Sequence, residues 1–320
     1  MILKKNKRHI ALLISGLICF FLTGCASKTI MAEPEVKYGN PSRSHVKDIP
    51  EIRYKEQAES LKNNKPPEIN ADEYEKLGDA MLANGKYFMA FLQYENSLEK
   101  DKDNLRVEYK KGVAMLGGGR LQEAHDLFKI ILEKKPDFAL AYEGIGRVNF
   151  RNKLYPVAKF NFEKAIGLDP LLWRSYSYLG HIHDVSKEYD LAIREYKTAL
   201  TIKPRAGFVY NNLGVSLSMT GHYKEAVDSF YHALELGYSS NKVYNNLGQV
   251  LMKLDLYDKA FEAFKKAGSE AVAWNNIGVG YLNDGRINKA AHCFKKAIEL
   301  NPKFYVLANE NLKKCRLKQK

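Results

Sequence analysis

The feature that most constrains this chain is a repeat with a period of 34 residues, which runs from Ala71 to Phe304. Each unit has glycine at its eighth position, alanine at its twentieth and an aromatic residue at its twenty-fourth. A chain that repeats one such pattern in register stacks copies of one supersecondary unit, because a single copy cannot bury its apolar face alone. The units begin at Ala71, Leu105, Ala139, Trp173, Gly207, Asn241 and Ala271.

The last unit shows the pattern most clearly. It reads Trp274-x-x-Ile277-Gly278-x-x-Tyr281, followed by Ala290-x-x-x-Phe294, Ala297 and Pro302. This pattern resembles the tetratricopeptide-repeat family. The resemblance implies an all-α, right-handed superhelical solenoid of seven helix-turn-helix repeats over residues 71–304. The small residues then let the two helices of a repeat approach closely, and the aromatic rings fill the space beside them. The amphipathic segment 305–320 is the capping helix that the end of a solenoid needs.

Two repeats depart from the pattern. The second has Glu108 and Lys111 where an aromatic residue and a leucine belong, so we expect its first helix to pack less well. The sixth has only 30 residues, and four are missing before Trp274. We expect a local change of curvature between the sixth and seventh repeats.

The N-terminus has the pattern of a bacterial lipoprotein. A basic stretch precedes thirteen mostly apolar residues, too few to span a bilayer comfortably, and the sequence LTGC follows at residues 22–25. This resembles a lipobox, which implies a signal peptide over residues 1–24 and acylation of Cys25, for example by palmitate. An ordinary signal peptide or an uncleaved anchor is the alternative. Residues 25–70 are polar and lack a sustained apolar period, which predicts a flexible tether behind the lipid.

Paired asparagines recur at positions 5 and 6 of the last three repeats. Positions 2, 6, 9 and 13 share one helix face, and in the resembled fold this face lines the concave groove. We therefore expect Asn212, Asn246 and Asn276 to face the groove, with Asn211, Asn245 and Asn275 at its flank. An amide offers both donors and an acceptor, so three in register form a ladder for the backbone of an extended peptide. The alternative is that these asparagines are solvated and merely typical of the family.

The remaining candidate peptide-binding residues change in character along this face. The earlier repeats carry basic residues, namely Arg106, Lys110, Arg147, Arg151 and Arg174, and the later repeats carry Phe208, Met219 and Lys242. A partner segment with acidic residues at one end and apolar anchors at the other fits this order, unless the arginines are only a solvated face. The carboxylate clamp that binds chaperone C-termini in related domains needs asparagine at position 9. This chain does not match it there, which disfavours chaperone C-termini as partners: the residues at position 9 include Val113, Val215, Gln249 and Val279.

No sequence motif indicates catalysis, a cofactor or a metal. The glycines at 117–119 lack the spacing of a phosphate-binding loop, and His181 and His183 are two residues apart on a predicted helix, so they point in different directions. The formal charge is +13, or 13 − 4 = +9 without the four basic residues of the signal peptide, which does not by itself predict nucleic-acid binding. A disulfide between Cys293 and Cys315 is left open.

These features together predict a non-enzymatic, membrane-anchored adaptor for protein partners. In a Gram-negative host the absence of aspartate after Cys25 favours the outer membrane, facing the periplasm, over the inner membrane. The combination of lipobox, tether and solenoid resembles the lipoproteins of tight-adherence (Flp) pilus systems, which implies a role in assembling a pilus or secretion machine. A scaffold or regulator of cell-wall (peptidoglycan) enzymes is the alternative. The partner and the oligomeric state stay open.

Overall fold

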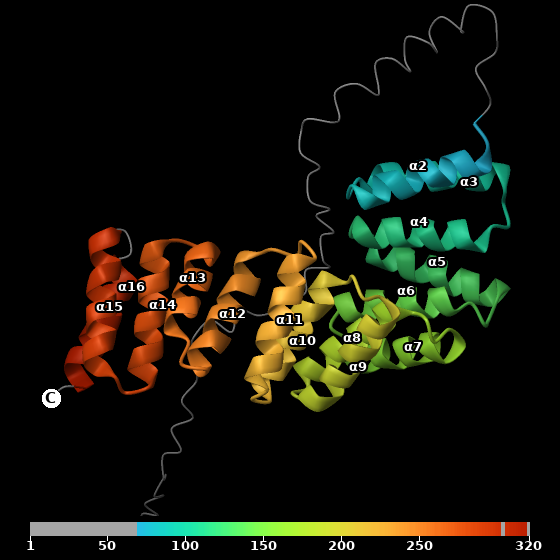
Figure 1. Ribbon diagram of the computed structural model, residues 1–320. Coiled ribbons are helices and arrows are strands. Elements are labelled where there is room, and N and C mark those ends of the chain that lie inside the picture. The colour runs from blue at the N-terminus through green and yellow to red at the C-terminus, as the bar shows by residue number, and fades with distance from the viewer. Residues whose placement is uncertain (1–68, 302–304, 319–320) are drawn as a thin grey trace, which may run out of the picture. The chain divides into compact units, whose positions relative to one another are not determined.

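The computed structural model describes residues 69–301 and 305–318 of the chain. The predicted signal peptide, Cys25 and nearly all of the predicted tether lie outside these residues. The described residues form α-helices and no strand, and the helices alternate along the chain between the two members of a pair (Figure 1). The first helices are α2 (Ala71–Ala83), α4 (Leu105–Gly117), α6 (Ala139–Arg151), α8 (Trp173–Val185), α10 (Gly207–Met219), α12 (Asn241–Lys253) and α14 (Glu270–Asn283). The second helices are α3 (Tyr87–Lys100), α5 (Leu121–Lys134), α7 (Tyr155–Leu168), α9 (Tyr189–Ile202), α11 (Tyr223–Glu235), α13 (Tyr257–Ala267) and α15 (Ile287–Leu300).

Each helix packs against its neighbours in the chain, so the pairs form a continuous stack. First helices of successive pairs also contact one another directly, α4 with α6, α8 with α10, α10 with α12 and α12 with α14. A final helix, α16 (Tyr305–Lys318), packs on α15 and α14 through buried Ala308, Leu312 and Cys315. The predicted all-α solenoid of helix pairs is confirmed, and α16 occupies the place of the expected capping helix.

The contact that recurs in every pair joins the glycine at position 8 to the aromatic ring at position 24. A Cβ atom added to Gly248 would lie only 2.7 Å from Cε1 of Phe264, and one added to Gly78 would lie 2.5 Å from Tyr94. The seven rings are almost completely buried, since their exposed fractions are 0% or 1%. The glycine is therefore required because the ring lies directly on the helix backbone, and no side chain fits between them.

Two of the seven rings are tyrosines, and each hydroxyl group has an acidic partner. Tyr94 donates to Asp79 at 2.8 Å, and Tyr196 donates to Asp184 at 2.8 Å. A buried hydroxyl without a partner would cost free energy, so the aspartates satisfy the polar end of a side chain whose body packs like phenylalanine. Burial raises the pKa of Tyr196 well above its ordinary value, so this tyrosine remains a hydrogen-bond donor.

The turn inside every pair has the same backbone geometry. The fifteenth residue of each repeat has a positive φ, from 58° at Asp255 to 83° at Gly119 and Gly221. Three of these residues are not glycine, namely Lys153, Lys187 and Asp255. The left-handed conformation that ends a first helix is thus imposed by the packing of the pair even where the residue disfavours it.

The two irregular repeats are accommodated locally. Glu108 is buried and accepts a hydrogen bond from Lys134 at 2.5 Å, while the Lys111 ammonium lies 3.7 Å from Glu95. The polar residues of the second repeat are therefore paired with charges from second helices. In the sixth repeat α13 has 11 residues, and only Gly268 and Ser269 separate it from α14. Ser269 caps α14 by accepting from Val272 N at 3.3 Å. The expected change of curvature stays a prediction.

The close approach of ring and glycine predicts the effect of adding a single methyl group. Gly248→Ala should lower the free energy of unfolding by about 1–3 kcal/mol, because Phe264 must move from its site. Gly167→Ala on α7 is the matched control, since nothing lies within 4 Å of a Cβ atom at that position. Removing glycine from an open helical site should leave stability unchanged or raise it by up to about 1 kcal/mol. Urea denaturation measures both, and equal midpoints for the two variants would refute the contact.

Candidate functional site

The side chains that project from the first helices away from the second helices form what we call the first-helix face. It comprises positions 2, 5, 6, 9 and 13 of each repeat, and all nine predicted peptide-binding residues belong to it. The direct contacts of α8 with α10, α10 with α12 and α12 with α14 bring the residues of the last four repeats onto neighbouring helices. Arg147 and Arg151 lie on α6, which contacts α4 and is joined to α8 by the hydrogen bond from Ser175 to Glu143.

The three position-6 asparagines do not have the same environment. Asn246 and Asn276 are half-buried, as expected for the surface of a groove, but Asn212 is only 9% exposed. Asn246 makes no side-chain hydrogen bond to another described residue. Asn276 accepts from the Asn275 amide at 3.3 Å. Two of the three predicted ladder residues are therefore available at the surface in this structure.

Asn212 is buried because it belongs to a polar network that crosses from one repeat to the next. Its amide hydrogen bonds to the hydroxyl of Tyr196, which itself donates to Asp184. Ser216 donates to the same carboxylate at 2.6 Å. Asn211 donates to Asn212 at 3.2 Å, and its own carbonyl oxygen is buried without a hydrogen-bond partner among the described residues. Sequence periodicity could not reveal this network, because it depends on a tyrosine in the preceding repeat.

Position 5 is the part of the face that the sequence analysis missed. Asn211 and Asn275 are 7% and 4% exposed, so they lie between first helices and not merely at the flank of the groove. Asn311 of the capping helix donates to Asn275 at 3.3 Å. Position 5 is three residues after position 2 and four before position 9, and this spacing places it on the same helix face. The helical spacing would have been sufficient to find it.

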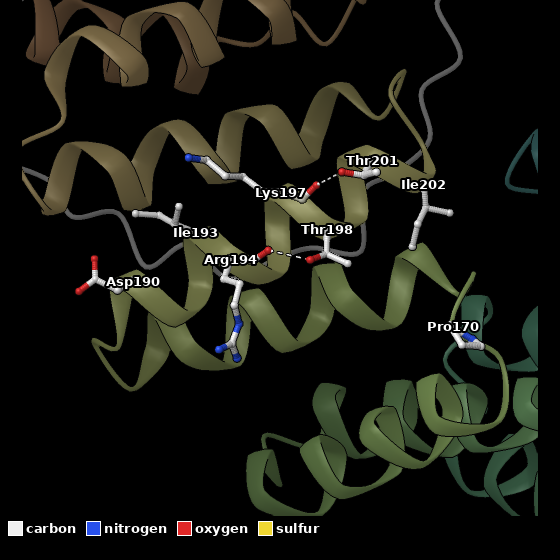
Figure 2. Close-up of a pocket in the computed structure, with 8 residues that line it drawn as sticks. All are labelled: Pro170, Asp190, Ile193, Arg194, Lys197, Thr198, Thr201 and Ile202. Carbon is white, nitrogen blue, oxygen red and sulfur yellow. Dashed lines mark hydrogen bonds between the residues drawn. The ribbon is translucent and has the colours of Figure 1, made fainter.

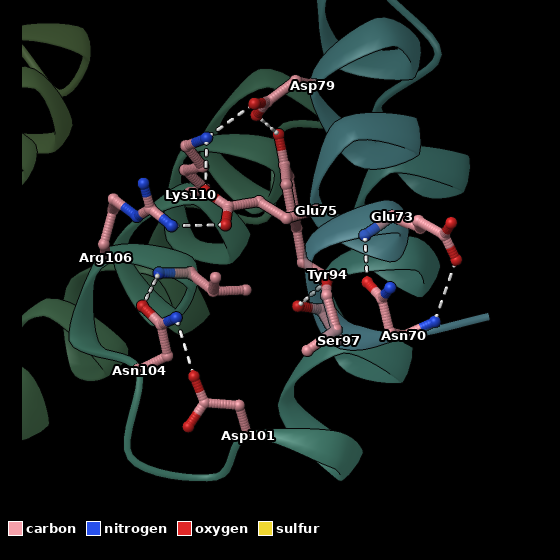
Figure 3. A network of polar contacts seen from close by, with 12 residues as sticks. Asn70, Glu73, Glu75, Asp79, Tyr94, Ser97, Asp101, Asn104, Arg106 and Lys110 are labelled. Atoms are coloured by element: carbon pink, nitrogen blue, oxygen red, sulfur yellow. Dashed lines mark hydrogen bonds and ion pairs between the residues drawn. The ribbon is translucent and has the colours of Figure 1, made fainter. Parts of the chain in front are cut away.

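The basic residues of the earlier repeats are partly neutralised within the chain. Figure 3 shows Arg106 and Lys110 of α4 converging on Glu75 of α2, at 2.6 Å and 2.7 Å. Lys110 also lies 2.6 Å from Asp79. Arg151 donates to the backbone carbonyl of Leu116 at 2.8 Å. Arg106, Lys110 and Arg151 are thus engaged by the protein itself.

Arg147 and Arg174 lie around a second polar cluster at the centre of the stack. Glu143 is 2% exposed and accepts hydrogen bonds from Ser175 at 3.0 Å and Tyr109 at 3.4 Å. Burial raises the pKa of Tyr109, and the charges of Arg147 and Arg174 oppose this rise. The Arg174 side chain is exposed, with its guanidinium 4.5 Å from the centre of the Trp173 ring. This arginine is the basic residue of the predicted set that is best placed to meet an acidic group.

The later residues of the set are two apolar side chains of α10 and one lysine of α12. Phe208 is half-buried between aromatic neighbours, with ring centres 5.9 Å from Trp173 and 6.4 Å from Tyr238. Met219 is 57% exposed, and Lys242 is exposed. Phe208 and Met219 lie near opposite ends of α10, and the exposed methionine offers adaptable apolar contact to a partner side chain.

A hollow of about 640 Å³ lies away from this face, along α9 and Pro170 (Figure 2). Thr198 and Thr201 line it, but their hydroxyls donate back to the carbonyls of Arg194 and Lys197, both at 3.0 Å. Its hydroxyl donors are therefore already used within α9, and the charged side chains that line it are Asp190, Arg194 and Lys197.

The histidines and cysteines are placed separately. His183 lies 2.6 Å from Glu188, while burial lowers the pKa of His181 to about 4. Cys293 and Cys315 are buried and are not joined in a disulfide. Within residues 69–301 and 305–318 no group of three acidic, histidine or cysteine side chains is arranged to hold a metal ion. No described helix has the length and apolar character needed to cross a membrane.

Comparisons with known proteins agree with the fold. Models described as "Tetratricopeptide repeat" match residues 109–160, 209–237, 242–267 and 271–304. Curated protein sequences gave no match.

Solved structures are similar at low sequence identity. The crystal structure of the APC/C hetero-tetramer Cut9–Hcn1 is 19% identical, with a TM-score of 0.56 over 82% of this chain and 52% of that one. This chain thus spans about half the length of that relative. YrrB, "a TPR protein with an unusual peptide-binding site", is 24% identical, with a TM-score of 0.50 over 58% of this chain and 97% of that one. PilF of Pseudomonas aeruginosa is 21% identical, with a TM-score of 0.49 over 62% of this chain and 92% of that one.

The network around Asp184 predicts a pH-dependent stability. Burial raises the pKa of Asp184 from 3.8 to about 6, against the opposing effects of Ser216, Tyr196 and His183. Because the folded-state pKa lies above the unfolded one, the stability that this group contributes is complete below pH 3.8 and is lost as pH rises through about 6.

Asp184→Asn keeps the neutral form at every pH. The variant should therefore gain stability relative to the natural protein between pH 4 and pH 7, by up to about 3 kcal/mol. Thermal unfolding across this range measures the difference, and Asp190→Asn, at an exposed position of α9, is the control. A difference that stays constant with pH would show that Asp184 is ionised in the fold throughout.

Proposed function

We propose that this tetratricopeptide-repeat protein is a non-enzymatic adaptor that binds an extended segment of a partner protein along its first-helix face. The observation that carries the proposal is the exposure of amide groups on the adjoining helices α12 and α14. Asn246 is half-buried and has no side-chain hydrogen bond to another described residue. Asn276 is half-buried and accepts from Asn275 through its carbonyl oxygen, so its amide donors have no partner among the described residues. Repeats of this family generally serve as scaffolds for protein interaction.

The chemistry of the face fits a peptide backbone. An extended segment presents backbone N–H and C=O groups that, in a helix, would already be bonded to one another. Each asparagine side chain can accept from such an N–H group and donate to such a C=O group. Phe208 and Met219 on α10 supply apolar contact beside the amides. Lys242 and Arg174 add positive charge on either side of α10, which favours a segment with carboxylates flanking its apolar anchor.

The place of this binding in the cell rests on the sequence. A lipid at Cys25 would hold the adaptor at the outer membrane, facing the periplasm, and several acyl chains anchor a protein far more firmly than one. The architecture of lipobox, tether and solenoid resembles TadD of the tight-adherence (Flp) pilus system. On this basis the partner is a component of a pilus or secretion machine. If the protein captured cell-wall enzymes instead, it would be a scaffold or regulator of peptidoglycan enzymes.

Substitution of the exposed amides tests the binding face. Asn246→Ala with Asn276→Ala should weaken partner capture about 30-fold, since each lost hydrogen bond is worth on the order of 1 kcal/mol. Stability should hold, because alanine is the better helix former and neither side chain is fully buried. The measurement is quantitative recovery of envelope proteins on the immobilised protein, with circular dichroism as the folding control.

Asn152→Ala is the matched control for that experiment, since Asn152 is exposed just after α6 and outside the first-helix face. The position-5 asparagines are poor controls, because burial of Asn211 and Asn275 makes their replacement a stability change. Wild-type recovery by the double variant would show that the face binds through other residues, or not at all.

The lipid anchor is tested independently of the binding face. Cys25→Ser should abolish metabolic labelling by palmitate and release the protein from the outer-membrane fraction, because serine cannot form the thioether to the lipid. Cys293→Ser is the control for a thiol elsewhere in the chain. Labelling that persists in Cys25→Ser would exclude this residue as the acylation site.

A further inference from the structure

A cavity of about 680 Å³ lies between the second helices α13 and α15, with α14 as its floor. The α14 side chains that line it are Trp274, Ile277 and Tyr281, at positions 4, 7 and 11 of the repeat. These positions face the second helices, so the cavity opens on the side of the stack opposite to the first-helix face. It is therefore separate from the proposed peptide-binding residues.

Five of the eleven residues that line it carry aromatic rings. Tyr257 and Tyr281 are stacked with ring centres 4.3 Å apart, and Phe261 meets Trp274 edge to face at 4.8 Å. His292 stands nearly perpendicular to Trp274, with ring centres 6.4 Å apart. Edge-to-face contacts leave ring faces uncovered, and Trp274 is only half-buried. Such faces carry partial negative charge and attract cations.

Two carboxylates stand on the α13 wall of the same cavity. Asp258 and Glu262 are one helical turn apart, both are exposed, and neither forms an ion pair or hydrogen bond with another described residue. On two other second helices, Glu225 is paired with Lys197 and Glu299 with Lys296. Uncompensated carboxylates beside open ring faces favour a cation in the space between them.

The chain itself contains an example of this arrangement at the rim of the cavity. The guanidinium of Arg286 lies 5.5 Å from the centre of the Tyr257 ring and 5.9 Å from that of Tyr281, and 3.1 Å from Asp255. Lys289 lies 5.5 Å from the centre of the Tyr281 ring. Arg286 and Lys289 thus lie over the rings of the tyrosine pair. Among the described residues no cation lies over the Phe261 or Trp274 ring.

We propose that this cavity binds an arginine side chain of a partner protein, with the guanidinium stacked on Trp274 and paired with Asp258 and Glu262. Arginine fits better than lysine because its planar guanidinium stacks on a ring while it donates to two carboxylate oxygens. The volume exceeds that of one side chain, so the residues flanking the arginine enter as well. The adaptor then has two binding sites on opposite sides of its last repeats.

Tryptophan fluorescence tests this directly, because the chain has two tryptophans and Trp173→Phe leaves Trp274 as the reporter. Titration of the Trp173→Phe protein with acetyl-Gly-Arg-Gly-amide should give a saturable change in emission. The same peptide with citrulline, which has the shape of arginine without its charge, should bind at least about 10-fold more weakly. A change that does not saturate, or equal binding of both peptides, would overturn the proposal.

Charge removal provides the second arm. Asp258→Asn with Glu262→Gln should weaken binding of the arginine peptide about 10-fold or more. Glu225→Gln with Asp228→Asn on α11 removes two exposed carboxylates from the preceding repeat and should leave binding unchanged. Asn246→Ala with Asn276→Ala should also leave it unchanged, so failure of this site and failure of the first-helix face are distinguishable. Unchanged binding by the α13 variant would refute the site. The proposal would also be refuted if the protein sedimented as a dimer and the α13 variant as a monomer, because a second copy of the chain would then occupy the cavity.

Discussion

An aromatic ring lying on a bare helix backbone is the interaction on which the rest of this structure depends. Because Gly248 and its counterparts carry no side chain, the ring at position 24 fixes the distance between the two helices of each pair. Because the same distance between the two helices recurs in all seven pairs, each first helix has the same position relative to its second helix. The residues that project from the first-helix face are consequently free of the packing problem, and their identities can differ from repeat to repeat without altering the stack.

That separation between packing and recognition is incomplete, because several residues of the first-helix face are buried, and the fourth repeat shows one cause. Tyr196 replaces phenylalanine there, and its hydroxyl extends the core as far as Asp184, Ser216 and Asn212. One ring substitution therefore draws a residue of the first-helix face into the interior. The same amide residue type is structural in the fifth repeat and available at the surface in the sixth, although the local sequences are identical.

This difference marks the limit of what the sequence alone predicts here. Period, helix pairs and the role of Gly248 follow from local pattern, because each depends on residues within one repeat. The burial of Asn212 does not, since its cause lies in the preceding repeat. The pairing of Arg106 with Glu75 is likewise a contact between repeats, and a sequence pattern shows the arginine but not its partner. The cavity between α13 and α15 could not be predicted from a sequence pattern either, because residues of three helices line it.

The joint between the first two repeats has a mechanical consequence. On one side α3 packs directly against α4, whereas α2 approaches α4 through the carboxylates of Glu75 and Asp79 and the cations Arg106 and Lys110. Apolar packing is little affected by dissolved ions, but partly exposed ion pairs are screened by them. The first two repeats are thus joined by direct helix packing between α3 and α4 and by ion pairs between α2 and α4. Tension applied through the chain ahead of Asn70 would reach α2 first. Rising ionic strength would weaken the ion pairs before it affected the packing of α3 on α4.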